Sequence, residues 1–528
     1  MKLKELYIPN HKGFVNFRTS FDESTPITTI IGQNGVGKSN LIETIISLFR
    51  TIDLGEQPEF NYQLKYECFG NDVEIAVDIH KKIKTAVKVN GKKSSLTFIR
   101  NDTNQCLPNN IFAYYSGTNW RVEELFVKHQ TKFYKNLTEG KDDELRRFFY
   151  CRDVHSFFVL LAFLVDKDRA CIEILKKLGI QSLDSVLFCL KKPYWFNGKP
   201  SEIQQKEGDS RFWYSRGVVK NFLRKLWDFS IAPIDNSERK TLDFRGRTEN
   251  QDRLYLFVPD DESLRSFAEN YKDTTEFFKH LESTYIADLI EEVSVTVNLD
   301  NGQKLTFNAL SEGERQLITV LGLMKFTRNR ESLFLLDEPD THLNPRWKMN
   351  YFSQIESILE EHDTDSKIKS LETSQVILTT HDPLMLTSLN AEQIRVLTKN
   401  EETGEKNSEP PSVDPKSMGV EAIIQSELYG IRTSLDEELQ HKIDLRNRLL
   451  SKAKLGKATN KELIKLNEEL ESLGLTQSHP NPYFSNFAKA LNRNPNFRRP
   501  HFTPTEYQDI QDLTDELLSE IINEGDQE

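Results

Sequence analysis

The sequence predicts an α/β protein whose mixed β-sheet is assembled from two distant parts of the chain. Three observations support this prediction. A β-branched run, a glycine-rich loop and an amphipathic helix follow one another over residues 27–49. An apolar run at residues 333–336 ends in two carboxylates. About 300 residues without sustained heptads separate these patterns, which indicates a compact helical insertion, and a further helical region follows the second pattern.

The composition is that of a folded, soluble protein. The 528 residues are 37% hydrophobic and 28% charged, and about 150 residues per domain would give two to four lobes. The net charge of −12 argues against an overall nucleic-acid coat, although a local basic stripe could still bind phosphate. Five scattered cysteines without a C-x-x-C pair predict a reducing cytoplasm. The longest apolar run, at residues 157–165, is about half the length that spans a membrane, so we expect a buried helix and no membrane partner.

The glycine-rich loop has the pattern Gly32-x-x-x-x-Gly37-Lys38-Ser39. Its glycines allow backbone N–H groups to surround a β-phosphate, and the helix N-terminus adds partial positive charge. We expect Lys38 to reach the β- and γ-phosphates and the Ser39 hydroxyl to bind Mg²⁺. The alternative is a glycine-rich turn flanked by a strand and a helix by chance. Other predicted contacts to the phosphates are Asn34, Gly35, Val36 and Asn40.

Two further strands end in polar residues. The run at residues 333–336 delivers Asp337 and Glu338 to the C-terminal edge of the sheet, where α/β proteins bind ligands. We expect Asp337 to hold the Mg²⁺ shell and Glu338 to accept a proton from the attacking water. His381 follows the next strand, within predicted reach of a γ-phosphate. Alone, the run that ends in Asp337 and Glu338 could equally be a strand end with a solvated turn, and a single histidine at a strand end is more often structural.

A helix with a polar start is predicted from "LSEGERQLITVLGLMKF", residues 310–326. Ser311 and Glu314 form a capping box, which by itself indicates an ordinary helix N-terminus. The other interpretation is a second anion site, in which the Ser311 hydroxyl and the Gly313 N–H approach a phosphate held by another copy of the chain.

The motifs "GQNGVGKS", "LSEGERQ", "LFLLDEP" and "TTH" resemble, in this order, the Walker A, signature, Walker B and H-loop motifs of ABC-type ATPases of the SMC, RecF and RecN branch. The resemblance implies a split ABC-type head that binds ATP and Mg²⁺. It also implies that Glu338 is the catalytic base and His381 the γ-phosphate switch. Residues Ser311, Gly313 and Glu314 would contact the nucleotide in trans, in a head-to-tail homodimer or a higher oligomer.

Two positions of this resemblance need separate mention. The segment "IPNHKGF" matches an opening strand turn near the phosphates, which implies a contact from Lys12. The branch carries a glutamine after a strand of its first lobe, whereas "NNIFAYYSGTNW" offers Ser116 or Asn119. The residue that takes the role of the Q-loop glutamine is therefore open.

The predicted organisation has four parts: an N-terminal half of the ATPase head (1–120), a helical and aromatic insertion (121–270), a C-terminal half of the head (271–400) and a polar linker with a helical partner-binding region (401–528). Within the insertion, "SVLFCLKKPYWF" and the basic, aromatic stretch at 211–231 are read as helical. That stretch is either a solvated face or a nucleic-acid contact. A lysine-rich hairpin at residues 78–95 also has two interpretations. Its lysines either protect an edge strand from aggregation, which is slightly favoured, or bind phosphate.

The C-terminal part predicts a helical hairpin over about 417–475, with a capping box at Thr459 and Glu462, followed by an acidic tail. No metal-nuclease constellation follows His381. The stretches "LFRTIDLGEQPEFNYQLKYECFG", "IFAYYSGTNWRVEELF" and "SMGVEAIIQSELYGIRTSLDEELQ" resemble the bacterial "restriction system-associated" AAA-family ATPases, which include the PtuA-type subunits of Septu anti-phage systems.

This second resemblance implies a cytoplasmic, slow ATPase that restrains or licenses a separate PtuB-like HNH nuclease. Some systems of this kind are joined to a retron reverse transcriptase and its DNA-RNA product. Two alternatives belong to other classes: a RecF- or RecN-like repair ATPase that binds DNA itself, and a scaffold that binds ATP without using its hydrolysis.

Overall fold

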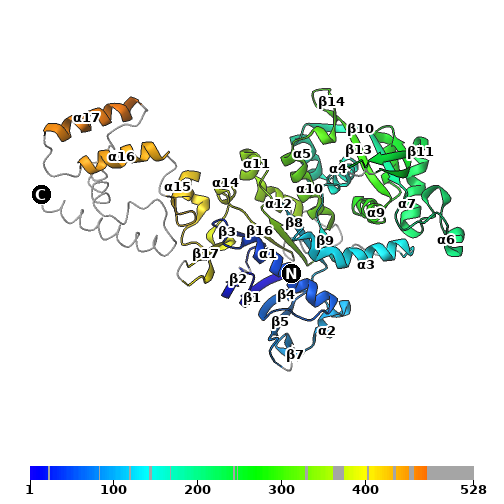
Figure 1. Ribbon diagram of the computed structural model, residues 1–528, viewed down its shortest axis with the longest axis horizontal. Coiled ribbons are helices and arrows are strands. Elements are labelled where there is room, and N and C mark those ends of the chain that lie inside the picture. The colour runs from blue at the N-terminus through cyan, green and yellow to red at the C-terminus, as the bar shows by residue number, and fades with distance from the viewer. Residues whose placement is uncertain are drawn as a thin grey trace. The chain divides into compact units, whose positions relative to one another are not determined.

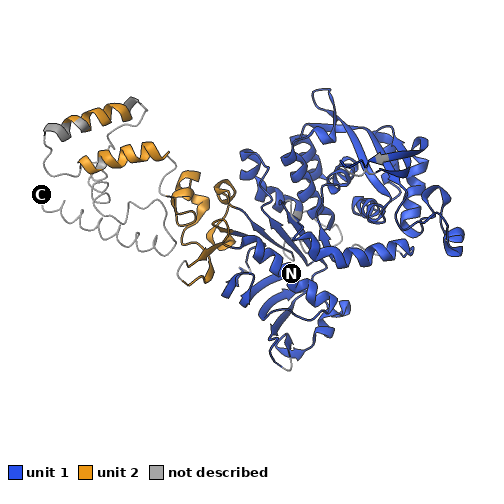
Figure 2. Ribbon diagram, viewed as in Figure 1, with its two compact units in different colours: residues 1–30, 37–380 blue, residues 31–36, 381–528 orange. Residues whose placement is uncertain are grey.

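The structure is a computed structural model that describes residues 1–472, apart from residues 22–23, 82–83, 118–119, 142–145, 167, 242–243, 247, 328–330, 361–373, 401–402, 432–435 and 451–456. The chain forms two compact units (Figure 2). Unit 1 contains residues 1–30 and 37–380, and unit 2 contains residues 31–36 and 381–528. Each unit is described by itself.

A parallel sheet forms the centre of unit 1 (Figure 1). Its strands pair in the order β3, β16, β15, β8 and β9, and every neighbouring pair is parallel. All residues of β15 and β16 are buried, as expected for strands covered on both faces. The strands span Ile27–Gly32 (β3), Gln375–Thr379 (β16), Ser332–Asp337 (β15), Asn110–Tyr115 (β8) and Phe148–Tyr150 (β9).

Helices cover this sheet because their apolar faces require burial. Helix α1 packs against β15, and α10 packs against β8, α4 and α12. Helix α4 is buried along almost its whole length, which confirms the predicted buried helix at residues 157–165. The helices are α1 (Lys38–Leu54), α4 (His155–Val165), α10 (Glu312–Thr327), α11 (Pro345–Met349) and α12 (Tyr351–Glu360).

A second, antiparallel sheet has the order β2, β1, β4, β5, β6 and β7. Its last two strands form the predicted lysine-rich hairpin around Asn90 and Gly91, which both have positive φ angles, as a tight hairpin turn requires. Lys82, which belongs to the predicted hairpin, lies outside the described residues. The elements are β1 (Lys2–His11), β2 (Phe14–Ser20), β4 (Tyr62–Cys68), β5 (Asn71–Val77), β6 (Thr85–Val89), β7 (Lys92–Ser94) and helix α2 (Leu96–Arg100).

The insertion contains both helices and a third sheet, with the antiparallel order β11, β12, β10, β13 and β14. The helical prediction for "SVLFCLKKPYWF" is wrong, because residues 180–191 form strand β10 at the centre of this sheet. The strands are β10 (Ile180–Lys191), β11 (Ile231–Thr241), β12 (Thr248–Val258), β13 (Ile290–Leu299) and β14 (Lys304–Thr306). The helices are α3 (Val127–Thr138), α5 (Arg169–Lys177), α6 (Glu202–Glu207), α7 (Gly217–Asp228), α8 (Asp261–Ala268) and α9 (Thr274–Ile286).

A buried ion cluster joins the segment before β9 to two helices. The Arg146 guanidinium lies 2.9 Å from Glu282, and the His155 Nε2 lies 2.7 Å from the same carboxylate. The Arg152 backbone N–H donates to the His155 Nδ1, so that Nε2 carries the proton that faces Glu282. Burial alone would raise the pKa of Glu282, but the His155 ring and the Arg146 guanidinium lower it to about 2.

In unit 2, β17 (Ile394–Lys399) pairs antiparallel with β18 (Lys406–Glu409), and helices α14 (Pro383–Leu386) and α15 (Val420–Gln425) lie together. Helices α16 (Glu437–Leu450) and α17 (Lys457–Ser472) pack against each other, as the predicted hairpin requires. The capping box predicted at Thr459 is wrong, because α17 already begins at Lys457. The predicted acidic tail lies outside the described residues.

These elements confirm the predicted α/β fold class with its mixed sheets. The four-part division at residues 120, 270 and 400 stays a prediction. Among the described residues, no helix combines the length and the hydropathy that crossing a bilayer requires.

Candidate nucleotide site

Helix α1 begins with an N-terminus that is open to an anion. Gly37 is its N-cap residue, with φ of 113°, and within the described part of the chain no side chain caps the first turn. The leading N–H groups of a helix have no partner inside the helix, so they can donate to phosphate oxygens. The strand, loop and helix order predicted from the sequence is therefore present.

Asp337 forms the acidic part of the site at the carboxyl end of β15. Its side chain is 2% exposed and accepts hydrogen bonds from the Thr379 hydroxyl and from Ser39. Burial raises the pKa of Asp337, whereas the Thr379 and Ser39 hydrogen bonds and the Lys38 charge act to lower it. A buried carboxylate whose ionised form is disfavoured in this way would be stabilised by a bound cation. The two predicted Mg²⁺ ligands, Ser39 and Asp337, are in direct contact.

Lys38 is the basic group of the same cluster and is 6% exposed. Burial lowers the pKa of its ammonium group, and the charges of Glu338 and Asp337 raise it. The cluster therefore holds a buried cation beside carboxylates, at the start of a helix whose N–H groups are available. This donor set fits a nucleotide phosphate with its divalent cation.

Glu338 has an unusual backbone conformation for a residue with a side chain. Its φ is 48°, in the left-handed region that non-glycine residues seldom occupy. Its N–H donates to the carbonyl oxygen and the hydroxyl of Thr379, at 3.2 and 3.0 Å. Such strain is concentrated at functional sites, and here it turns the chain sharply after β15.

The phosphate loop and His381 belong to unit 2. Gly32 has φ of 151°, and a Cβ atom at this position would lie 2.4 Å from the Leu397 carbonyl oxygen, so no other residue fits without a shift of backbone. The Val36 N–H donates to the Gln33 carbonyl at 3.3 Å, and the Tyr429 hydroxyl donates to the carbonyl oxygen of His381. The predicted contact of the His381 side chain with a γ-phosphate stays a prediction.

The start of α10 is held by the predicted capping box. The Ser311 N–H donates to the Glu314 carboxylate at 2.9 Å, and the Glu314 N–H donates to the Ser311 hydroxyl at 3.3 Å. Gly313 is required here, because a Cβ atom would lie 2.2 Å from the His342 carbonyl oxygen. The Gln316 side-chain amide donates to the Pro339 carbonyl at 2.8 Å. The loop that follows Glu338 thus packs directly on the first turns of α10.

Lys12, Glu43 and Arg121 form contacts at α1 that were not predicted from the sequence. Lys12, predicted to contact phosphate, forms an ion pair at 2.7 Å with the buried Glu43. Arg121 pairs with the same carboxylate and donates to the Asn40 side chain at 2.7 Å. Neither Glu43 nor Arg121 belongs to a motif. Their contact joins helix α1 to a loop that is distant in the sequence, so no local pattern predicts it. The phosphate contact of Lys12 stays a prediction.

Of the two candidates for the Q-loop position, Ser116 and Asn119, the structure describes only Ser116. The Ser116 N–H donates to the Asp337 carbonyl oxygen at 3.2 Å, so Ser116 adjoins the acidic strand end. Asn119 lies outside the described residues. The Ser116 contact is made by the backbone and continues the pairing of β8 with β15, so the Q-loop residue stays open.

Comparison with protein families gives two matches. A family described as "AAA ATPase domain" matches residues 1–152, and one described as "AAA domain, putative AbiEii toxin, Type IV TA system" matches residues 202–387. The chain resembles the ABC-type AAA ATPases. The first match contains the Walker A-like motif and the second contains the other three motifs, which agrees with the resemblance seen in the sequence.

Curated relatives share low sequence identity with this AAA-type chain. The "Retron Vc95 probable ATPase" of Vibrio cholerae serotype O1 biovar El Tor is 23% identical over 429 residues, which cover 76% of this chain and 74% of that protein. "Septu protein PtuA" of Bacillus mycoides (strain KBAB4) is 28% identical over 177 residues, which cover 32% of this chain and 23% of that protein. Septu protein PtuA of Bacillus thuringiensis is 26% identical over 221 residues, which cover 36% of this chain and 52% of that protein.

Among solved structures, the SMC head domain from Thermotoga maritima aligns with a TM-score of 0.32 and 13% identity, over 78% of this chain and all of that one. At this TM-score the likeness supports no conclusion about the fold, which rests on the strand order described above.

Proposed function

We propose that the chain binds Mg²⁺ and ATP at the start of α1 and hydrolyses ATP slowly, as the sensor subunit of a bacterial anti-phage defence system. The observation that carries the ATPase part is the contact of Ser39 with the buried Asp337, beside the buried Lys38. These are the groups that hold the metal and the phosphates in phosphate-loop enzymes. Both family matches, each described as an AAA domain, support the same assignment.

Each side chain has a defined task in this proposal. Lys38 and the N–H groups at the start of α1 neutralise the charge of the β- and γ-phosphates. Ser39 and Asp337 hold the metal, which stabilises the charge that develops on the phosphate oxygens. Glu338, turned away from the strand by its left-handed backbone, orients the attacking water and accepts its proton. Catalysis is then mainly positioning and charge stabilisation.

A second copy of the chain completes the site in this proposal. The Ser311 hydroxyl and the N–H of Gly313 lie at the start of the 16-residue helix α10, where Ser311 is exposed and Gly313 is buried. In a head-to-tail dimer they contact the nucleotide held by the partner, and a single protomer therefore turns over poorly. Such a requirement links hydrolysis to assembly, which suits a sensor.

The relatives support the biological part of the proposal. Their names place them in retron and Septu systems. By analogy, we assign this chain to a cytoplasmic complex in which its nucleotide state restrains or licenses a separate HNH nuclease, with a retron reverse transcriptase and its DNA-RNA product as a further partner. A pull-down with the product of a neighbouring nuclease gene, in ATP and in ADP, tests this assignment; equal recovery in both states contradicts it.

Substitution of the proposed base tests the enzyme itself. Glu338→Gln should retain ATP binding and lower hydrolysis by about 10² to 10⁴-fold, because only proton transfer is lost. Lys38→Ala should weaken ATP binding by about 100-fold or more, because a buried charge contact to phosphate disappears. Titration with ATP and a phosphate-release assay measure the two effects. Unchanged ATP affinity in Lys38→Ala would refute the site, and the exposed Lys128→Ala serves as control.

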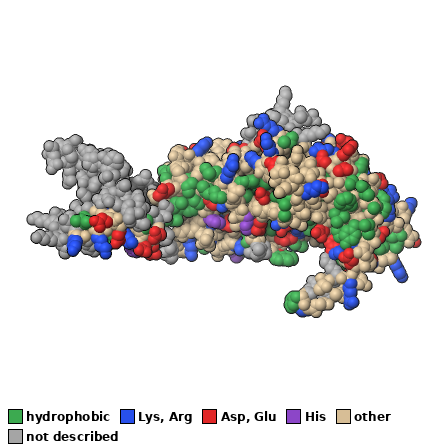
Figure 3. All heavy atoms as spheres, turned by 90° about the horizontal axis from the view of Figure 1, so that it is seen from above, with side chains coloured by type: hydrophobic (Ala, Val, Ile, Leu, Met, Phe, Trp, Pro, Cys, Tyr) green, Lys and Arg blue, Asp and Glu red, His purple; other side chains and the backbone are tan. Residues whose placement is uncertain are grey.

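A DNA-repair ATPase that binds DNA directly is the alternative, and the lysine hairpin would be its DNA contact. Lys84, Lys88, Lys92 and Lys93 are exposed on β6, β7 and the preceding residues, although Lys88 is paired with Glu74 at 3.1 Å. Basic and acidic side chains are interspersed on the face seen in Figure 3. Strong, salt-sensitive and ATP-dependent DNA binding that disappears when this hairpin is neutralised would establish the alternative.

A further inference from the structure

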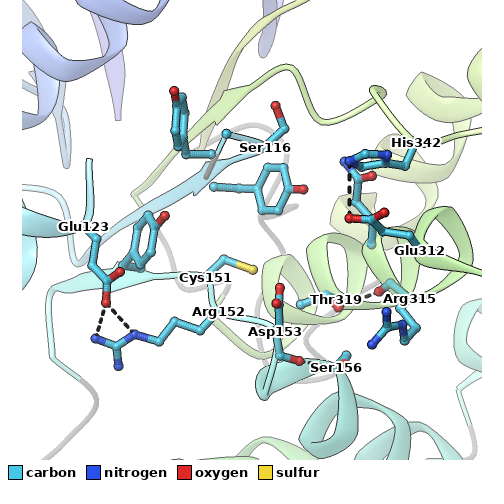
Figure 4. Close-up of a pocket in the computed structure, with 15 residues that line it drawn as sticks. Ser116, Glu123, Cys151, Arg152, Asp153, Ser156, Glu312, Arg315, Thr319 and His342 are labelled. Carbon is cyan, nitrogen blue, oxygen red and sulfur yellow. Dashed lines mark hydrogen bonds and ion pairs between the residues drawn. The ribbon is translucent and has the colours of Figure 1, made fainter. Parts of the chain in front are cut away.

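A cavity of about 330 Å³ opens at the carboxyl ends of β8 and β9, against the first two turns of α10 (Figure 4). The α10 side chains that line it are Glu312, Arg315, Gln316 and Thr319, which share one helix face through their spacing of three and four residues. Lys38, Ser39 and Asp337 do not line this cavity, although Ser116, whose N–H is bonded to Asp337, does. Three tyrosines, Tyr114, Tyr115 and Tyr150, also line it, together with Glu123, Arg152 and Asp153.

Most charged groups of the cavity already have partners. The Arg152 guanidinium lies 2.8 Å from Glu123, and Glu312 lies 3.4 Å from His342, as the dashed lines of Figure 4 show. These two pairs leave one guanidinium and one carboxylate, from Arg315 and Asp153, for a ligand.

Arg315 and Asp153 have no side-chain partner anywhere in the described part of the chain. The Arg315 Nε is buried without a hydrogen bond, and so is the Oε1 of Gln316, whose side chain is 7% exposed. Both atoms are enclosed by protein and do not face the cavity, so a ligand in the cavity would meet the terminal nitrogens of the Arg315 guanidinium and the exposed Asp153 carboxylate. Arg315 comes from α10 and Asp153 from the segment before α4, so the two charges approach the cavity from different elements (Figure 4).

The charge balance excludes a polyphosphate as the ligand. Three carboxylates line the cavity, from Glu123, Asp153 and Glu312, against two guanidinium groups. A second ATP molecule would bring several negative charges next to unpaired Asp153. The ligand must instead offer acceptors to a guanidinium, donors to a carboxylate, and a flat surface to the phenol rings of three tyrosines.

We infer that this cavity binds a guanine base. Guanine presents two acceptors, O6 and N7, on one edge, which an arginine recognises in a bidentate manner, as Arg315 would here. Its neighbouring edge carries the N1–H and N2–H₂ donors, which the Asp153 carboxylate accepts. Tyrosine rings stack on bases. Adenine is a poor substitute, because its amino group would face the guanidinium and it lacks the two donors for Asp153.

Occupation of the cavity has a consequence that rests on the proposed function. A bound base would touch both α10, which carries Ser311 and Gly313, and Ser116, whose N–H is bonded to Asp337. Guanine would therefore change the rate of ATP hydrolysis. Guanosine binding can be measured without ATP hydrolysis, so the guanine site and the proposed ATPase activity can be refuted independently.

Isothermal titration of guanosine into the full chain carrying Lys38→Ala tests the binding, because this background removes the proposed ATP site. Guanosine should bind, and adenosine should bind at least about tenfold more weakly. Asp153→Asn and Arg315→Gln should each lower guanosine affinity by about tenfold or more. The control is Arg169→Gln, which removes a 90% exposed guanidinium that does not line the cavity and should leave affinity unchanged.

Circular dichroism and thermal melting of each variant exclude unfolding as the cause. No heat of guanosine binding at millimolar ligand, or equal affinity in Asp153→Asn, Arg315→Gln and the control, would overturn the assignment. Equal affinity for adenosine would also overturn it. A thymine oligonucleotide with a single guanine identifies the source of the base: guanine-dependent oligonucleotide binding that Asp153→Asn abolishes supports a nucleic-acid strand, and binding of guanosine alone supports a free nucleoside.

Discussion

Unit 1 contains two buried charge clusters that use the same kinds of side chain with opposite results. In the cluster of Arg146, His155 and Glu282, the charges meet one another and the pKa of the carboxyl is lowered to about 2. In the cluster at the end of β15, burial prevails and the pKa of the Asp337 carboxyl is raised, although Lys38 lies close by.

The difference distinguishes a cluster that holds the fold together from one that is prepared for a ligand. Glu282 joins α9 to α4 and to the segment before β9, and its charge is compensated within the protein. Asp337 receives hydroxyl hydrogen bonds but insufficient positive charge, so its ionised form is disfavoured until a cation arrives. Substitutions in the two clusters should therefore change stability in opposite directions.

The largest change in stability is expected for Glu282→Gln. Removal of one partner from a buried ion pair leaves a charge uncompensated, which should lower the free energy of unfolding by about 3 to 5 kcal/mol. Chemical denaturation measures the loss. The partly exposed Glu276→Gln on the same helix is the matched control, and its loss should stay below about 1 kcal/mol. Equal losses in the two variants would show that the cluster has no special role.

A smaller effect of opposite sign is expected for Asp337→Asn. Replacing a carboxylate that burial disfavours should raise the free energy of unfolding of the nucleotide-free protein by on the order of 1 kcal/mol. The same variant should lose the increase in Tm that wild type shows with Mg²⁺ and ATP. The exposed Asp300→Asn should change neither quantity. A destabilised nucleotide-free Asp337→Asn protein would contradict the comparison.

A third expected effect is a pH dependence of the loss in Glu282→Gln. Glu282 has a pKa of about 2 in the folded protein against an ordinary value of 4.5, so its stabilising contribution is present above pH 4.5 and disappears as pH falls toward 2. The difference in unfolding free energy between wild type and Glu282→Gln should therefore narrow when pH is lowered from about 5 to about 3. A difference that stays constant over this range would show that the pKa of the Glu282 carboxyl is the same in the folded and the unfolded protein.

The elements whose hydrophobic pattern is visible within a short stretch of sequence were predictable. Strands β15 and β16 are short apolar runs that end in polar residues, and α1 and α10 have clear starts. Strand β10 was misread because Phe188, Cys189 and Leu190 are all buried, so the alternation that reveals a strand is lost.

The candidate site was predictable where its residues belong to motifs, as with Lys38, Ser39 and Asp337. Thr379 acquires its role only through strand register, because it stands beside Asp337 on the neighbouring strand. The contact of His155 with Glu282 joins residues 127 positions apart, and Arg121 meets Asn40 across 81 positions. No local pattern encodes such contacts, so these needed the structure.

The central claim is that two copies of the chain build each ATP site, one through Lys38 and the other through Ser311. Mixing two inactive variants, Lys38→Ala and Ser311→Arg, tests this claim most directly. A mixed head-to-tail dimer has one site in which both residues are intact, so phosphate release should rise well above the sum of the separate variants. A mixture no more active than that sum, or full activity of Ser311→Arg alone, would contradict the composite site.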